Sequence, residues 1–126
     1  MSTLVVSNIS DGTTTVGASY VTNGSAKAWM NLNGTGTIAI RDSFNVSSVT
    51  DNSNGAYTQN FTNSLLNGNY STNVTGTHDA GSYVSWGSVA NDTPPSTTAF
   101  RGDYLNAAGT PTDVSYAQTS CFGDLA

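Results

Sequence analysis

Residues 27–61 alternate apolar and polar side chains with a period of two, and this pattern constrains the fold more than any other feature of the chain. Ala28, Met30 and Leu32 fall on one face of such an extended segment, whereas a helix would scatter them around its axis. Asn-Gly and Asp-Asn-Ser-Asn-Gly runs interrupt the alternation, and both favour turns because Asn and Gly tolerate positive φ. The stretch therefore predicts a meander of short antiparallel strands.

The rest of the chain extends this pattern with little sign of helix. No long window keeps the period of about 3.6 residues that an amphipathic helix requires. Residues 90–112 are rich in loop formers, and a final strand is expected over residues 114–122. About seven to nine short strands predict an all-β fold, an antiparallel β-sandwich with a jelly roll as one possible form. The expected organisation is an N-terminal arm or edge strands over residues 1–26 and a single β-sandwich domain over residues 27–126.

The chain carries few charges and few apolar residues. Charged residues make up 9% and hydrophobic residues 37% of its 126 residues. A typical soluble domain has about 25% charged residues. The uncharged polar residues suit sheets and turns, but they leave a thin core in a domain of this size. Because sharing a core with neighbouring copies would compensate, the composition favours a homo-oligomer.

The charge balance excludes several classes of partner. The net charge is −5 and only three residues are basic, too few for a stripe that binds phosphates, so no nucleic-acid partner is expected. No apolar run approaches the roughly 18 residues of a membrane span, and the first residues lack the pattern of a signal peptide. The single Cys excludes an internal disulfide, and we expect the protein to be made and folded in a cytoplasm.

Trp29 is the first candidate for an interface between subunits. It points to the face opposite Met30, so a strand packed on one core would place this large aromatic residue on its outer side. We expect both faces to be covered, by a second sheet or by another copy of the chain, with a half-exposed Trp as the alternative. Met30, Leu4 and Val6 are the other interface candidates, because the sparse apolar residues of the N-terminal segment suit an arm that packs on another subunit. An ordinary edge strand is the alternative for that segment.

No constellation of residues predicts catalysis, a cofactor or a metal site. His78 and Asp79 are neighbours, and adjacent residues in a strand point to opposite faces, so they form no catalytic pair by themselves. Cys121 lies in the expected last strand beside Phe122 and is interpreted as a buried apolar residue. The run over residues 51–55 resembles the start of a calcium loop, but the chain has no Glu to supply the bidentate ligand. We therefore interpret it as a hairpin turn.

Four aromatic residues in the second half of the chain are the candidates for a surface that binds a ligand or partner: Tyr83, Trp86, Phe100 and Tyr104. Aromatic side chains stack on sugars and anchor interfaces, but they also fill cores. For at least half of these residues the core is the favoured interpretation.

Residues 27–62 read KAWMNLNGTGTIAIRDSFNVSSVTDNSNGAYTQNFT. The combination of Lys-Ala-Trp, Asn-Gly-Thr-Gly-Thr, a following Arg, Asn-Val-Ser-Ser and Thr-Asp-Asn resembles a module common in tailed-bacteriophage virion proteins, especially of phages that infect marine and freshwater bacteria. Asn69-Tyr70 and Phe122-Gly123-Asp124 are similar to its later parts, and the opening Met-Ser-Thr-Leu-x-Val is similar to the start of such proteins. The resemblance covers roughly half of the chain and leaves residues 76–113 unmatched.

The resemblance implies a non-enzymatic structural protein of the virion, made in the host bacterial cytoplasm and assembled as a homotrimer. The expected function is that of a surface fibre or spike-like module, for attachment or for particle stabilisation. Its implied partners are copies of itself, other capsid or tail proteins and, as a further option, host surface glycans. A capsid decoration (cement) protein is the first alternative, because the chain lacks the extended shaft of long fibres. A lectin-like carbohydrate-binding module is the second, and a small hydrolase is disfavoured by the absent constellations.

Overall fold

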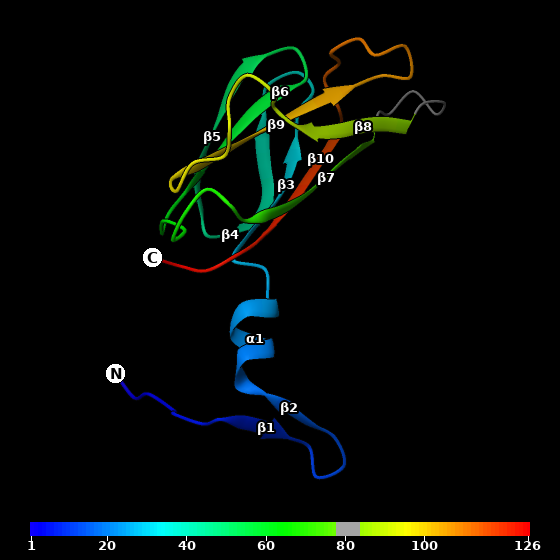
Figure 1. The fold of residues 1–126 in the computed structure, drawn as a ribbon. Coiled ribbons are helices and arrows are strands. Elements are labelled where there is room, and N and C mark those ends of the chain that lie inside the picture. Colours follow the sequence, from blue (N-terminus) through cyan, green and yellow to red (C-terminus); the bar gives the residue numbers. More distant parts are fainter. Residues whose placement is uncertain (78–83) are drawn as a thin grey trace.

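The protein consists of a β-sandwich with an arm that projects from one end of it (Figure 1). The computed structural model describes residues 1–77 and 84–126, without the side chains of residues 84–86 and 88. The arm contains β1 (Asn8–Ser10), β2 (Thr15–Gly17) and α1 (Ala18–Gly24). The strands of the sandwich are β3 (Ala28–Asn33), β4 (Ala39–Phe44), β5 (Val46–Ser53), β6 (Ala56–Phe61), β7 (Ser71–Thr77), β8 (Val84–Val89), β9 (Ala99–Leu105) and β10 (Tyr116–Phe122).

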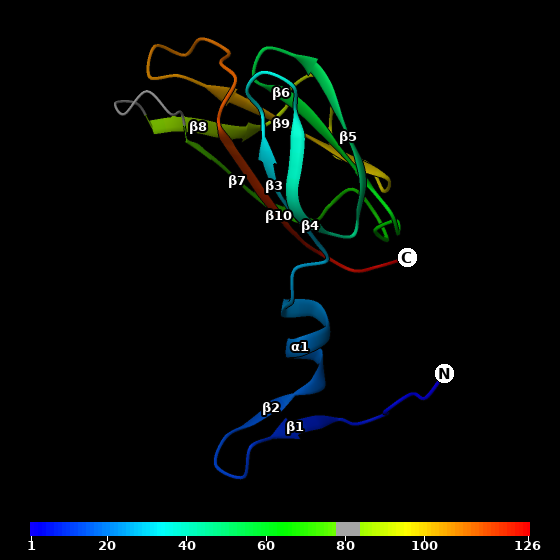
Figure 2. The same ribbon diagram turned by 180° about the vertical axis from the view of Figure 1, so that it is seen from behind.

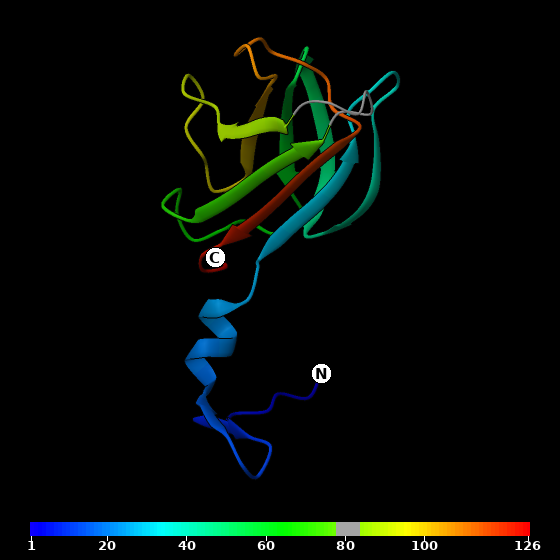
Figure 3. The same cartoon turned by 90° about the vertical axis from the view of Figure 1, so that its right-hand side faces the viewer.

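The eight strands of the sandwich form one curled sheet. Their order is β4-β3-β10-β7-β8-β9-β6-β5, and neighbouring strands are antiparallel throughout. β3, β10 and β7 lie in one layer and β9, β6 and β5 in the other, with β8 leading from one to the other (Figure 3). The predicted all-β antiparallel sandwich is therefore confirmed. The strand order of the sheet differs from that of a jelly roll, because β4 pairs with β3 at the edge of the sheet, whereas a jelly roll would pair it with β9.

The core forms between the two layers because each central strand presents alternate side chains to the interior. In β3 the buried positions are Ala28, Met30 and Leu32, as the sequence predicts, and β9 has the same alternation. The rings of Tyr57 in β6 and Tyr104 in the neighbouring β9 pack beside each other on the inner face of one layer, with their centroids 5.7 Å apart. A second cluster at the other end of the sandwich contains Ala28, Phe61, Leu65, Phe100 and Cys121.

A glycine allows the sheet to turn from one layer into the other. At Gly87 of β8, a Cβ atom would lie 2.4 Å from Cγ1 and 2.7 Å from the carbonyl oxygen of Val74 in β7. Real side chains do not approach backbone atoms this closely, so only glycine fits where these strands cross. The curvature that closes the sandwich thus depends on a residue without a side chain.

Two features of the fold correct the sequence analysis. The seven-residue helix α1 was not predicted, because it is too short to give a helical period and it buries none of its residues. β9 lies within the predicted loop-rich segment, where its inward residues Phe100, Gly102 and Tyr104 do alternate. The glycine at the centre of that alternation removes one apolar signal.

Within the described residues, no helix has the length and apolar character needed to cross a bilayer.

Candidate functional site

The arm is the most exposed part of the described structure. In a single chain, the exposed fraction is 84% for Leu4, 89% for Val5 and 41% for Val6. The arm projects away from the sandwich, with the β1–β2 hairpin at its far end (Figure 2). Among the described residues, the hydrogen bonds of the arm join it only to itself. Its apolar side chains, including Ile9, Tyr20 and Val21, are thus exposed at the surface and do not contribute to the core.

The local interactions of the arm are too few to stabilise it alone. Its hairpin has three residues in each strand, and an isolated two-stranded hairpin is marginal in water. Helix α1 has seven residues, no side-chain cap at Gly17 and no acidic residue in its first turn. Isolated helices of fewer than about 12 residues are marginal even in favourable sequences. The arm's own contacts therefore contribute little to its stability.

The side chain of Asp11 orders the turn at the tip of the arm. Asp11 Oδ1 accepts hydrogen bonds from the backbone N–H groups of Thr13 at 2.9 Å and Thr14 at 2.7 Å. These bonds to the charged carboxylate lower the pKa of Asp11 below its usual range. The hairpin turn is thus locally specified, whereas the apolar segment before it is free of such constraints.

The outer face of the β4-β3-β10 layer carries exposed aromatic side chains. Trp29 on β3 lies directly opposite Phe44 on β4, and in a free chain their exposed fractions are 36% and 54%. Trp29 thus lies at the surface of one chain, where a second copy can cover it. Phe44 was not singled out from the sequence, and its place across from Trp29 depends on a shift of register between Asn31 and Leu32 that the alternation does not reveal. Met30 is 3% exposed and belongs to the core of its own chain, so its assignment to an interface is wrong.

Arg41 on β4 makes hydrogen bonds that join the strands of this same layer. Its guanidinium donates hydrogen bonds to the carbonyl oxygens of Leu32, at 2.9 Å, and Ser115, and lies 4.1 Å from the ring centre of Tyr116. The guanidinium is thus directed to carbonyl groups of its own chain. It holds the edge strand β4 against the middle of the layer and leaves the aromatic pair of Trp29 and Phe44 unblocked.

The candidate surface aromatics from the second half of the chain do not form a surface in the described structure. Phe100 and Tyr104 are each 1% exposed and belong to the two core clusters, so they are core residues, as favoured for at least half of the four aromatics, and not surface-binding residues. Both point inward because they occupy alternate positions of β9. Tyr83 lies outside the described residues, as does the side chain of Trp86 in β8.

The 51–55 run ends in a hairpin turn that is hydrogen-bonded to the loop before β10. A carboxylate oxygen of Asp113 accepts hydrogen bonds from the backbone N–H of Gly55 at 2.7 Å and from the hydroxyl of Tyr57 at 2.8 Å. Gly55 has a φ of 72°, which a glycine adopts without strain. These contacts agree with the predicted hairpin turn. The described residues contain no group of three or more His, Cys, Asp or Glu placed to hold a metal ion.

Cys121 is the residue considered for chemistry whose surroundings the structure describes. Cys121 is fully buried, and burial raises the pKa of its thiol to about 12, so the thiolate nucleophile is disfavoured at neutral pH. His78 and Asp79 lie outside the described residues.

Comparison with known proteins found no match to a protein family, to a curated protein or to a solved structure. The resemblance to a phage virion module therefore stays a prediction from the sequence.

Proposed function

We propose that this chain is a non-enzymatic structural protein of a tailed-bacteriophage virion, a homotrimeric surface fibre or spike-like module for attachment or particle stabilisation. The observation that carries the proposal is the arm. It exposes a run of apolar residues, it has few interactions of its own, and it projects away from the sandwich. Such an element gains its stability from a partner surface.

The outer face of β3 and β4 supports assembly as the use of these features. Trp29 and Phe44 are adjacent across the two strands, and aromatic residues are enriched at the centres of protein interfaces. The face lies on the strand into which the arm leads, so the arm and the aromatic pair are joined by only a few residues of chain. The resemblance of residues 27–62 to a virion module supplies the biological setting.

The mass of the full chain in solution tests the assembly. A trimer has a mass of about 39 kDa, against 13.0 kDa for one chain, and light scattering separates the two. We expect the triple variant L4S/V5S/V6S to shift the mass towards that of one chain, because it removes the exposed apolar run. L66S is the matched control, since Leu66 is equally apolar and 57% exposed but lies on the sandwich. A single-chain mass for the unmodified protein at micromolar concentration would contradict the proposal.

Locating the protein on a particle tests the setting. An antibody against the sandwich should label purified virions, and a reconstruction of the particle should show density of this size on the tail or the shell. Binding to host cells or glycans would support a fibre, whereas loss of shell stability in particles without the protein would support a decoration protein. Virions that lack the protein altogether would refute the viral setting while leaving the assembly untouched.

A further inference from the structure

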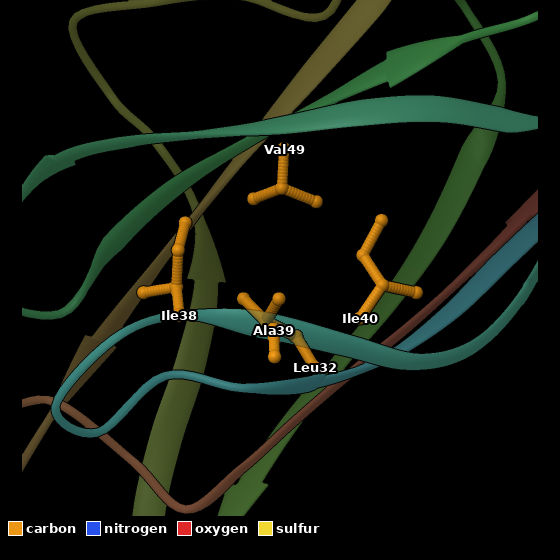
Figure 4. A pocket seen from close by; sticks show the side chains of 5 residues that line it. All are labelled: Leu32, Ile38, Ala39, Ile40 and Val49. Atoms are coloured by element: carbon orange, nitrogen blue, oxygen red, sulfur yellow. The ribbon is translucent and has the colours of Figure 1, made fainter.

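A notch opens in the wall of the sandwich between its two edge strands (Figure 4). It has a volume of about 190 Å³ and is lined by Leu32 of β3, by Ile38, Ala39 and Ile40 at the start of β4, and by Val49 of β5. Ile40 is exposed although it is a large aliphatic residue. An apolar cavity of about 150 Å³ accepts a ligand of the size of benzene, so this notch has room for one or two aliphatic side chains.

The two strands that flank the notch have free backbone edges. β4 and β5 are the ends of the sheet order, so each pairs with a neighbour on one side only. The chain turns from β4 directly into β5 at Asn45, which has a φ of 57°, and the strands then diverge instead of pairing. Unpaired N–H and C=O groups along a strand edge are a template for another extended segment. The notch therefore offers both apolar contacts and backbone hydrogen bonds.

The start of the arm has the complementary chemistry. Residues 3–6 read Thr-Leu-Val-Val, are uncharged and exposed, and belong to no strand of the described structure. In an extended conformation Leu4 and Val6 share one face and Val5 lies on the other. Four residues of strand span about 13 Å, the reach of a short added strand.

We propose that residues 3–6 of one copy insert as an added strand between β4 and β5 of a second copy, with Leu4 and Val6 filling the notch. This inference rests on the proposed assembly and names the contact that produces it. The direction of the arm favours exchange between copies, because the arm leads away from the sandwich and places the N-terminus outside its own notch (Figures 1 and 2). Each copy then donates one strand and receives one, which closes the sheet at the point where a single chain leaves it open.

Filling the notch from within tests the inference. In the full-length chain, Ile40→Trp places a bulky ring in the space that the arm would occupy, because Ile40 lies across from Leu32 and lines the notch, and Leu66→Trp adds a ring at an exposed site away from it. We expect I40W to weaken self-association by at least about tenfold, the effect of losing one buried aliphatic side chain, and L66W to leave it unchanged. Thermal melting of both variants shows whether the sandwich has kept its stability.

Cross-linking between mixed chains supplies a measurement that does not depend on a bulky substitution. Chains with Leu4→Cys, labelled with a heavy isotope, are mixed with unlabelled Val49→Cys chains and oxidised. We expect a disulfide between the two kinds of chain, and no link when Leu66→Cys replaces Val49→Cys. The native Cys121 does not interfere, because it is fully buried.

Three other results would each refute a different part of the inference. If I40W associates normally while L4S/V5S/V6S does not, the arm assembles the protein at another surface, and the notch is refuted with the proposed function intact. If a chain that carries both L4C and V49C links only within itself, the arm occupies its own notch, which refutes exchange between copies. If the unmodified chain is a monomer, the inference and the proposed assembly fail together.

Discussion

The hydroxyl of Tyr57 donates a hydrogen bond to a carboxylate oxygen of Asp113 at 2.8 Å, and its oxygen also lies 2.9 Å from the carbonyl oxygen of Gly34. These residues are far apart in sequence, and their contact joins the β5–β6 hairpin to the loop that leads into β10. The same Asp113 oxygen accepts the backbone N–H of Gly55. The Asp113 carboxylate thus fixes both the β5–β6 turn, through Gly55, and the core ring of Tyr57.

We expect Asp113→Ala to lower the free energy of unfolding by about 1–3 kcal/mol, because it leaves the backbone N–H of Gly55 without its acceptor and removes one of the two acceptors near the Tyr57 hydroxyl. Denaturant unfolding followed by Trp fluorescence measures the change. Asp42→Ala is the control, since Asp42 is exposed and accepts a hydrogen bond from the adjacent Ser43, and it should change stability by less than about 0.5 kcal/mol. Equal effects of the two substitutions would show that the Asp113 contacts contribute nothing specific.

Gly87→Ala should destabilise the sandwich, because the added methyl group would lie 2.7 Å from the backbone oxygen of Val74, which cannot move without opening the sheet. We expect a loss of about 1–3 kcal/mol or failure to fold. Gly24→Ala provides the comparison, since a Cβ at Gly24 meets no atom within 4 Å and its φ is not positive. Thermal melts of the two variants should differ clearly, and similar melting temperatures would contradict the close approach of β7 and β8.

Two aromatic substitutions separate the core from the assembly surface. Phe100→Ala should cost about 3–5 kcal/mol of folding stability, because the ring is 1% exposed in a packed cluster. Phe44→Ala should change the unfolding free energy of the sandwich little and instead weaken self-association. Denaturant unfolding and light scattering on both variants provide the two readings. If F44A unfolds like F100A, Phe44 belongs to the core and not to an interface.

Stability should fall at alkaline pH. Burial raises the pKa of Cys121 from 9.0 to about 12 and raises the pKa of Tyr104 above its ordinary value of 10.0, so both are neutral in the folded state. When the chain unfolds, these groups ionise more readily, so their contribution to stability is complete below about pH 9 and declines as the pH rises from there towards 12. Each group changes the unfolding free energy by at most about 1.4 kcal/mol per pH unit.

Urea unfolding between pH 8 and pH 11 measures this decline. Tyr104→Phe should flatten the part of the curve above about pH 10, because the variant lacks one of the tyrosines whose pKa is raised by burial, the others being Tyr57 and Tyr70. A midpoint that stays constant up to pH 11 would show that the thiol and the phenol are accessible to solvent in the folded protein.

The local pattern of the chain was enough to predict its class and its first strands. Alternation over Ala28, Met30 and Leu32 predicted which face of β3 is buried, and the Asn- and Gly-rich run at 51–55 predicted the β5–β6 turn. Both features depend on neighbouring residues, because strand periodicity and turn chemistry act over a few positions of chain. The low charge likewise indicated uncharged polar strands in place of helices.

The tertiary structure decided what each side chain faces. Phe100 and Tyr104 are aromatic residues in a segment of loop formers, and only the pairing of β9 between β8 and β6 shows that they belong to the core. The exposed pair of Trp29 and Phe44 depends on a shift of register between β3 and β4. The exposed arm and the notch between β4 and β5 also depend on where distant strands end in the sheet. Such long-range pairing is selected by the packing of the whole sandwich, which no short stretch of sequence specifies by itself.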